Sequence, residues 1–328
     1  MTAPSNTRPK TRRCLLILNP RARSGEANAG AIADLLRAED LQVLAAAAGD
    51  REALANAVRA HAGAVDLVVV GGGDGTLNAA LPGLIDTGLP LGVLPLGTAN
   101  DLARTLGIPV DLRDAVRMAA TAVPRPIDVG EVNGVHFLNV ASIGLSVDLA
   151  RSLTREMKKR WGVLGYALAG FRVLRRLRPF HAEVRIGGSV ERVTSVQIGI
   201  GSGRHYGGGM AVEADAAPDD GRLDVYSIDV RGWWELPRLY PAFRSGHHGQ
   251  WENVHTWDCT AVEIATSRRL PVNTDGELTT WTPARVRVLP GAVRVACPPK
   301  VSGSSGDVTP RPEPTSASRP SEQVPEGR

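Results

Sequence analysis

The feature that most constrains the fold is a unit that occurs three times in the first third of the chain: a short apolar run, a glycine-containing loop and a helical pattern. Continuous apolar runs of this length are typical of buried parallel strands, whereas the segments after the loops space their apolar residues as helices do. The predicted strands are 14–18, 66–70 and 91–94, and the predicted helices are 28–37, 77–85 and 102–106. Strands that alternate with helices favour a parallel sheet with helices on its faces. Ligands of such sheets bind at the carboxyl ends of the strands, which is where the three loops lie.

From about residue 129 the pattern changes to short apolar or alternating runs between Gly, Pro and Asp. The change predicts a second, mostly antiparallel β-rich part. Its runs are 137–141, 182–186, 195–199, 223–228, 261–265, 286–289 and 293–296, with helical insertions at 151–178 and roughly 233–244. Residues 301–328 contain five Pro, six Ser and no aromatic, Leu or Ile, so they cannot bury apolar area and are predicted to be disordered.

Basic residues are concentrated in two segments of a chain whose net charge is +4. Residues 1–13 and 151–178 together carry +12, which leaves −8 for the rest. This asymmetry indicates an anionic partner surface, either a membrane or a nucleic acid. The aromatic residues of 151–178 lie inside an apolar run rather than between basic residues, which disfavours nucleic acid. A helix that packs on the protein and has solvated basic ends is the alternative for this segment.

No apolar run reaches the roughly 18 residues of a membrane span, and the run at 14–18 is too short for a signal-peptide core. We therefore expect a cytoplasmic protein that meets the inner face of the membrane peripherally. Three well-separated cysteines argue against a disulfide framework and a Cys-rich zinc site. The oligomeric state is left open, a homodimer included.

The three loops are candidates for binding phosphate, because glycine lets the backbone approach a ligand and the next helix directs N–H groups at an anion. One such loop alone is equally well an ordinary βα turn, but three together favour a nucleotide site. The chain has no G-x-x-x-x-G-K-S/T loop and no G-x-G-x-x-G after its first strand, which argues against Walker-type NTPases and dinucleotide-binding dehydrogenases. The candidate nucleotide-binding residues are Asn19, Pro20, Ser24, Gly25, Gly71, Gly72, Gly73, Gly75, Thr76, Asn78, Gly97, Thr98 and Asn100, of which Thr76 and Asn100 are also expected helix N-caps.

Asp74 lies in the most glycine-rich loop, where its carboxylate would repel phosphate unless a cation lay between them. Mg²⁺ prefers one or two carboxylates together with phosphate oxygens and water. Asp101 in the third loop is a second candidate ligand, with stabilisation of the helix N-terminus as the alternative. The loops therefore predict a site for phosphate and Mg²⁺.

Three strings in these loops resemble the catalytic domain of diacylglycerol kinases, a family that includes soluble bacterial lipid kinases and is related to sphingosine and ceramide kinases. They are N-P-x(3)-S-G at 19–25, G-G-G-D-G-T-L-N at 71–78 and P-L-G-T-A-N-D-L-A-R at 95–104. The third string separates lipid kinases from NAD kinases and phosphofructokinases, which share only the G-G-D-G element. Similar motifs at 127–130, 203–210, 218–224 and 275–277 extend the resemblance over roughly residues 14–297.

The resemblance implies an α/β nucleotide-binding domain followed by a β-sandwich domain, and an ATP-dependent kinase that phosphorylates a lipid hydroxyl, foremost that of diacylglycerol. It implies an ATP-binding domain at 14–130 to which about 286–299 return, a lipid-binding domain at 131–285, and disordered tails at 1–13 and 300–328. It further implies a Mg²⁺ network of Asp74, Asp101, Asp128 and Glu277, a general base at Asp275, and a second metal site at Asp220. An ordinary Asp-Gly turn is the alternative for both Asp275 and Asp220.

The resemblance constrains the lipid less than the reaction. Ser202 stands where the family often has Asn, and residues 145–147 also depart from the family pattern. A sphingoid-base or ceramide kinase would use the same phosphoryl-transfer site and is the first alternative. A non-catalytic lipid-binding protein of the same fold is the second, but such a protein would be expected to lack Asp74 or Asp275, and both are present.

Overall fold

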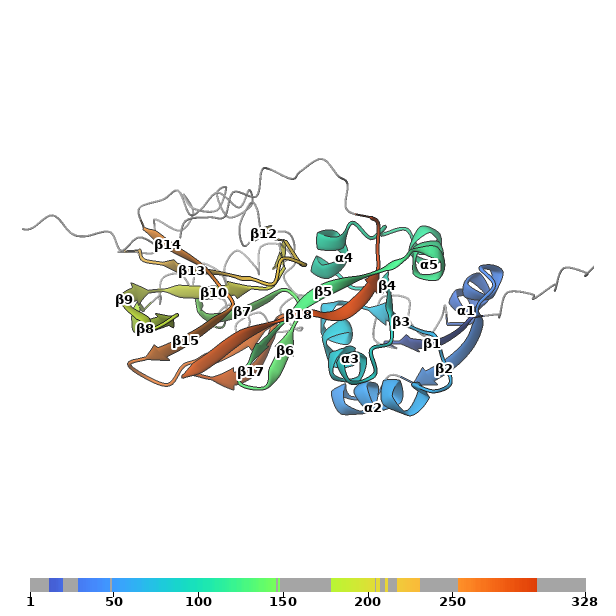
Figure 1. Ribbon diagram of the computed structural model, residues 1–328, viewed down its shortest axis with the longest axis horizontal. Coiled ribbons are helices and arrows are strands. Elements are labelled where there is room, and N and C mark those ends of the chain that lie inside the picture. The colour runs from blue at the N-terminus through green and yellow to red at the C-terminus, as the bar shows by residue number, and fades with distance from the viewer. Residues whose placement is uncertain are drawn as a thin grey trace, which may run out of the picture. The chain divides into compact units, whose positions relative to one another are not determined.

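The computed structural model describes residues 12–19, 29–47, 49–145, 147, 178–203, 205–206, 210–211, 217–230 and 253–299. Two large sheets, A and B, and helices on one part of sheet A make up this described chain (Figure 1). The helices expected at 151–178 and 233–244 and the tails expected at 1–13 and 300–328 lie outside the described residues, apart from positions 12, 13 and 178.

The first four strands form the parallel part of sheet A, in the order β2-β1-β3-β4. They are β1 (Arg13–Leu18), β2 (Gln42–Ala47), β3 (Leu67–Gly72) and β4 (Leu91–Pro95). The helices between and after them are α1 (Ala29–Ala38), α2 (Arg51–His61), α3 (Asp74–Thr87), α4 (Asp101–Leu106) and α5 (Leu112–Thr121). The sequence patterns missed β2, α2 and α5, which are rich in Ala and have few large apolar residues, although the apolar residues of α2 and α5 do gather on one face.

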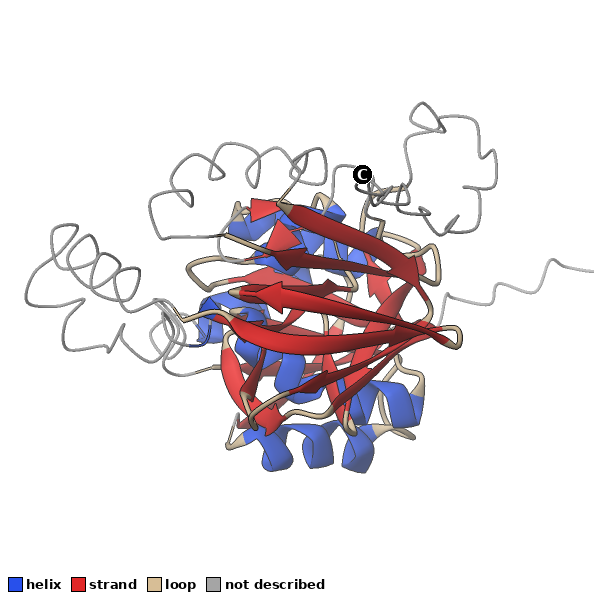
Figure 2. Ribbon diagram, turned by 90° about the vertical axis from the view of Figure 1, so that its left-hand side faces the viewer, coloured by secondary structure: helices blue, strands red, loops and turns tan. Residues whose placement is uncertain are grey.

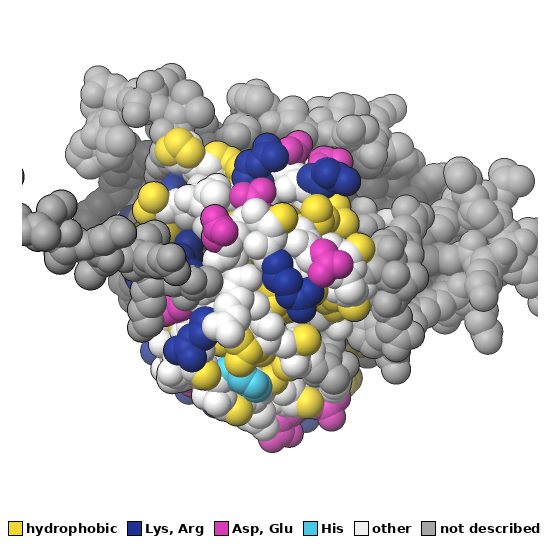
Figure 3. Space-filling view, turned by 90° about the vertical axis from the view of Figure 1, so that its right-hand side faces the viewer, with side chains coloured by type: hydrophobic (Ala, Val, Ile, Leu, Met, Phe, Trp, Pro, Cys, Tyr) yellow, Lys and Arg dark blue, Asp and Glu magenta, His cyan; other side chains and the backbone are white. Residues whose placement is uncertain are grey.

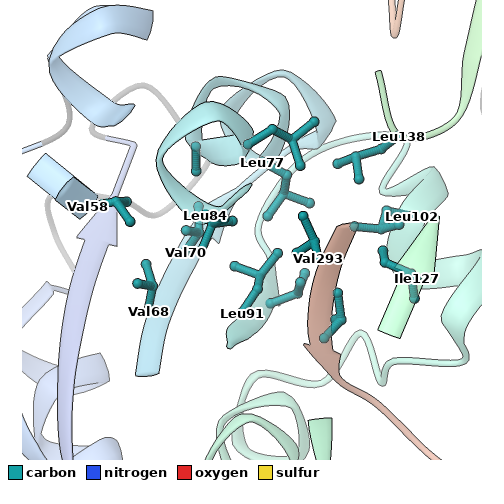
Figure 4. Close-up of a cluster of buried hydrophobic side chains, with 14 of the residues drawn as sticks. Val58, Val68, Val70, Leu77, Leu84, Leu91, Leu102, Ile127, Leu138 and Val293 are labelled. Atoms are coloured by element: carbon teal, nitrogen blue, oxygen red, sulfur yellow. The ribbon is translucent and has the colours of Figure 1, made fainter. Parts of the chain in front are cut away.

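Both faces of β1, β3 and β4 are buried, as a doubly covered sheet requires, whereas the edge strand β2 is partly exposed. Leu15 and Ile17 of β1 belong to a cluster with side chains of α2 and α3 (Figure 4), whereas Cys14 and Leu16 belong to a cluster with α1 and α5. Successive side chains of a strand point to opposite faces, so each strand supplies both clusters. The strands are thereby held rigidly, and so are the loops at their carboxyl ends.

Sheet A continues beyond β4 through one long strand, β18 (Ala284–Ala296), which is parallel to β4 and antiparallel to β5 (Pro124–Val132). The sheet then runs through β15 (Ala261–Thr266), β8 (Phe180–Ile186) and β9 (Ser189–Ser195), while β6 (Val135–Phe137) pairs with β5. The runs expected at 286–289 and 293–296 are thus one strand with an irregularity between Leu289 and Val293. Because β5 and β18 cross the expected domain boundaries near 130 and 286, those boundaries stay a prediction.

Sheet B is antiparallel and packs against the later strands of sheet A to form a sandwich (Figure 2). Its order is β14 (Val254–Cys259), β13 (Leu223–Ile228), β10 (Gln197–Gly201), β7 (Val140–Gly144), β16 (Pro271–Thr274) and β17 (Glu277–Trp281); β11 (His205–Tyr206) and β12 (Met210–Ala211) form a separate pair. Ile143 and Val272 of sheet B share a core with Val184 and Ile264 of sheet A. The expected fold class, a parallel α/β part followed by a mostly antiparallel sandwich, is confirmed.

The surface of the α/β part carries charges of both signs. Figure 3 shows acidic and basic side chains interspersed on the side of this part that lies to the right in Figure 1, with no large patch of one sign. Within the described ranges, no helix has the length and apolar character needed to cross a membrane.

Candidate active site

Asn19, at the end of β1, and the loops that follow β3 and β4 lie side by side at the carboxyl edge of the parallel strands, as expected. The N–H of Asn19 donates to the carbonyl of Gly71 (2.9 Å), and the N–H of Leu96 donates to the carbonyl of Gly72 (3.1 Å). Of the expected nucleotide-binding residues, Pro20, Ser24 and Gly25 lie outside the described residues.

The second and third loops touch through their glycines. A Cβ on Gly97 would clash with the Cα of Gly73 and would lie 2.6 Å from Oδ1 of Asn100. A Cβ on Gly73 would lie 3.2 Å from the Cα of Gly97. The absence of side chains therefore lets the two backbones meet, and it leaves a bare main-chain surface of the kind that binds phosphate.

Asn100 holds the third loop in shape. It precedes α4 with a left-handed backbone (φ 49°), which Asn tolerates better than most residues. Its Oδ1 accepts from the N–H of Gly97 (2.9 Å), and its Nδ2 donates to the carbonyl of Pro95 (3.1 Å). The expected N-cap position is therefore correct, but the side chain bonds backwards to the loop and does not cap the helix; Thr98 at the tip is exposed.

Asp74 links the second loop to the third. It is the first residue of α3, and its Oδ1 accepts from the N–H of Leu102 in the first turn of α4 (3.1 Å). The N-cap of α3 is Gly73, so the prediction that Thr76 caps this helix is wrong. Thr76 lies inside the first turn, where its Oγ1 accepts from Nδ2 of Asn19 (2.9 Å) and so joins the first and second loops.

Asp275 lies in the turn between β16 and β17, and its carboxylate accepts four hydrogen bonds. Oδ2 accepts from Nδ2 of Asn78 (2.7 Å) and the N–H of Leu138 (2.7 Å). Oδ1 accepts from the N–H groups of Asn139 (2.9 Å) and Val140 (3.1 Å). Burial raises the pKa of Asp275, and these hydrogen bonds oppose that shift. The carboxylate is thus enclosed by neutral donors that come from α3 and from the connection between β6 and β7.

Asn78 connects this carboxylate to the phosphate loops. Its Nδ2 also donates to the carbonyl of His136 (3.0 Å), and its Oδ1 accepts from Nη1 of Arg51. Nη2 of Arg51 in turn donates to Oε2 of Glu277 (2.7 Å). The carboxylate of Glu277 lies over the second loop, because a Cβ on Gly75 would lie 3.4 Å from its Oε1.

Arg51 and the N–H groups of residues 138–140 are the members of this site that the sequence patterns missed. Arg51 begins a helix that carried no recognisable motif, and no side-chain pattern identifies a backbone donor. The only sequence signal was the family string at 275–277, which pointed to Asp275 without its partners.

The acidic residues expected to form one Mg²⁺ network divide between two places. Asp74 and Glu277 flank the second loop, and the buried Asp101 begins α4 directly before Leu102, whose N–H donates to Asp74. Asp128 instead accepts from the N–H of Gly221 (2.6 Å) and of Gly291 (2.8 Å). These contacts join Asp128 to the turn at 218–221 and to β18, and its membership in one Mg²⁺ network with Asp74 stays a prediction.

The turn that was expected to bind a second metal is acidic. Burial and the negative charges of Asp128, Asp258 and Asp219 raise the pKa of Asp220, although the backbone N–H of Arg222 opposes this shift. Asp219 makes an ion pair with Arg125 (3.0 Å). Within the part of the chain that the structure describes, no three His, Cys, Asp or Glu side chains are arranged to hold a metal ion.

Comparison with known proteins agrees with this architecture. Residues 13–132 match the diacylglycerol kinase catalytic domain, and residues 139–297 match the YegS C-terminal NAD kinase beta sandwich-like domain. A diacylglycerol kinase of Bacillus subtilis is 32% identical over 215 residues, which cover 65% of this chain and 71% of that protein. A protein of Pseudomonas syringae pv. tomato named "Probable lipid kinase YegS-like" is 33% identical over 291 residues, which cover 88% of this chain and 94% of that protein.

Solved structures extend the similarity to three dimensions. A crystal structure of a diacylglycerol kinase from Bacillus anthracis aligns with a TM-score of 0.73 at 28% sequence identity. The alignment covers 89% of this chain and 99% of that one. Both halves of the fold are therefore shared with these proteins, and so is the order in which they occur.

Proposed function

We propose that this chain, which belongs to the family of lipid kinases with a diacylglycerol kinase catalytic domain, transfers the γ-phosphoryl group of ATP to the hydroxyl of diacylglycerol and forms phosphatidic acid. As a lipid kinase it is a phosphotransferase; the identity of the acceptor lipid, the use of ATP with Mg²⁺ and the roles of single residues are the proposal.

The observation that carries the proposal is the hydrogen-bonded chain from Asp275 through Asn78 and Arg51 to Glu277. It joins an enclosed carboxylate on the β-sandwich to the glycine loop that begins α3. A kinase needs this pairing, because a group that accepts the proton of the attacking hydroxyl must lie close to the bound phosphates. Binding of a nucleotide alone would not require such a carboxylate.

In the proposed reaction the lipid hydroxyl oxygen bonds to the γ-phosphorus while the bond from that phosphorus to the β,γ-bridging oxygen breaks, and ADP leaves. The hydroxyl proton passes to the carboxylate of Asp275. The bare loops at Gly71–Gly75 and Gly97 hold the phosphates, and Asn100 keeps the third loop in its binding shape. The raised pKa of Asp275 suits a general base, since proton transfer is most effective when the pKa of the base approaches the working pH.

The donor set at the second loop fits Mg²⁺, which prefers one or two carboxylates and completes its shell with phosphate oxygens and water. Asp74 and Glu277 flank this loop and would hold the ion, with Asp101 contributing through water. When bound, the ion offsets negative charge on the phosphates. Asp128 is not part of this set, because backbone N–H groups elsewhere bind both of its oxygens.

We place the reaction at the inner surface of an anionic membrane, on the basis of the sequence. The basic segments 1–13 and 151–178 carry +12 against −8 for the rest of the chain, and each basic group near an anionic leaflet contributes about 1 kcal/mol. Changing Lys158, Lys159, Arg160, Arg172, Arg175 and Arg176 to Gln is expected to weaken binding to anionic vesicles at low salt. Equal co-sedimentation of parent and variant would contradict this placement.

The deciding experiment is incubation with labelled ATP, Mg²⁺ and vesicles that contain diacylglycerol, ceramide or a sphingoid base, one lipid at a time. We expect labelled phosphatidic acid to be the main product. Main labelling of a sphingoid base or ceramide would replace diacylglycerol as the substrate. The Asp74→Asn variant is the control: it removes one charge and almost no volume, so it is expected to abolish turnover without unfolding the protein.

A further inference from the structure

Two residues of the backbone network around Asp275 carry a buried side-chain oxygen that has no role in the proposed reaction. Asn139 is 3% exposed and Ser202 is 2% exposed. Neither Oδ1 of Asn139 nor Oγ of Ser202 has a hydrogen-bond partner among the residues that the structure describes. A buried polar atom without a partner lowers the stability of the folded state, so its presence points to a partner from outside the chain.

Both residues are tied to the backbone that holds Asp275. The N–H of Asn139 donates to Oδ1 of Asp275 (2.9 Å), and the N–H of Ser202 donates to the carbonyl of Asn139 (3.0 Å). Asn139 lies between β6 and β7, and Ser202 follows directly after β10. The two unpartnered oxygens therefore lie on neighbouring segments beside the proposed base.

A hydroxyl that transfers its proton to Asp275 must come within roughly 2.6–3.2 Å of that carboxylate. The polar head that carries this hydroxyl then lies next to Asn139 and Ser202. An amide oxygen accepts hydrogen bonds only, whereas a serine hydroxyl also donates. Because the lipid hydroxyl gives its single proton to Asp275, the neighbouring ester carbonyl is the acceptor that is left for Oγ of Ser202.

We propose that Ser202 forms part of the subsite for the polar head of the acceptor lipid, with its Oγ donating to the ester carbonyl next to the free hydroxyl. The inference rests on the proposed function and specifies it further. A glycerol head with an ester next to the free hydroxyl offers this carbonyl. A lipid with an ether at that position does not.

The test is Ser202→Ala, with Ser227→Ala as the matched control. Ser227 lies on β13, two strands from β7, is completely buried, and also has an Oγ without a partner among the described residues. Because both changes remove a buried hydroxyl that bonds nothing in the chain, both variants are expected to melt at or slightly above the temperature of the parent. Only Ser202→Ala should change recognition of the lipid.

The measurements are the dissociation constant of 1,2-dioctanoylglycerol by calorimetry and the KM values for this lipid and for ATP. We expect Ser202→Ala to weaken binding of dioctanoylglycerol roughly tenfold and to raise its KM by a similar factor, as for one lost hydrogen bond. The KM for ATP should not change. The corresponding diether, which lacks the ester carbonyl, should bind parent and variant equally.

Equal weakening for ester and ether lipids, or for Ser202→Ala and Ser227→Ala, would overturn the subsite. A large fall in the melting temperature of Ser202→Ala with unchanged lipid binding would also overturn it and would assign Ser202 to a buried water. Binding is measured without turnover, so this result is separate from that of the proposed function. A parent that binds dioctanoylglycerol but does not phosphorylate it would contradict the reaction and leave the subsite standing.

Discussion

Asp275 and Asp128 both accept hydrogen bonds from backbone N–H groups in distant parts of the chain. They differ in the charge of their neighbours and in the residues to which their hydrogen bonds lead. Asp128 is 4% exposed and receives the N–H groups of Gly221 and Gly291. Its neighbours are acidic, and burial together with their negative charges raises the pKa of Asp220. The donors to Asp275 are neutral, and one of them, Asn78, leads to Arg51.

From this difference we infer separate roles, an anchor of the scaffold for Asp128 and the proposed general base for Asp275. Asp128 ties β5 to the turn at 218–221 and to the irregular part of β18. None of the hydrogen bonds found for it leads to a glycine loop. Asp275 ties the turn after β16 to α3, which begins at the second glycine loop. We therefore expect changes at Asp128 to affect stability and changes at Asp275 to affect turnover.

The largest effect is expected for Asp275→Ala. Loss of a positioned general base typically lowers the rate about 10²- to 10⁴-fold, so kcat should fall at least a hundredfold while the KM for ATP changes little. Steady-state kinetics with Mg²⁺ and a saturating lipid measure both values. A variant that keeps its kcat and loses ATP binding would show that Asp275 only anchors residues 138–140.

The opposite pattern is expected for Asp128→Ala. The change leaves the buried N–H groups of Gly221 and Gly291 without their acceptor, at a cost of about 1–3 kcal/mol in the free energy of unfolding. Urea denaturation measures this cost, and kcat should stay within about threefold of the parent because Asp128 is not expected to act in the transition state. Unchanged stability together with a hundredfold loss of kcat would contradict this prediction and would support a role for Asp128 in the catalytic Mg²⁺ network.

A smaller effect is expected for Arg51→Met, and it tests whether the connection through Asn78 matters. The guanidinium of Arg51 binds Oδ1 of Asn78 and so keeps Nδ2 of this amide facing Asp275. Without the guanidinium the amide of Asn78 can rotate by 180° and exchange the positions of its oxygen and nitrogen. We expect kcat to fall about 3- to 10-fold, which corresponds to about 1 kcal/mol or slightly more. The KM for ATP should stay nearly constant.

Arg59→Met is the matched control, because Arg59 lies on the same helix, is 40% exposed like Arg51, and also makes a 2.7 Å ion pair. Exposed pairs of this kind contribute at most about 1 kcal/mol, so both variants should melt close to the parent. In an Asp275→Ala background, Arg51→Met should cause no further loss, since residues that act as one unit are not additive. Equal losses of kcat in both arginine variants, or full additivity with Asp275→Ala, would remove Arg51 from the site.

The sequence by itself determined the parts of this protein that are local in the chain. Each glycine loop lies between a strand and a helix that follow one another in the chain. Apolar runs and glycines therefore predicted β1, β3 and β4 and the loops at their ends. Residue types also carried the family resemblance, because the strings at 71–78 and 95–104 are continuous. The prediction at Thr76 failed for a local reason: α3 begins at Asp74, directly after Gly73, which is three residues earlier than predicted.

Only the tertiary structure decided which distant groups share a site. Arg51 and Glu277 are 226 positions apart, and Asn139 and Asp275 are 136 apart. Hydrogen bonds over such separations depend on how sheets A and B pack, which hydrophobic periodicity does not record. For the same reason the sequence did not show the hydrogen bonds that Asp128 accepts from Gly221 and Gly291, and it could not identify the backbone donors at 138–140. Those donors are defined by conformation, since nearly every residue carries the same N–H group.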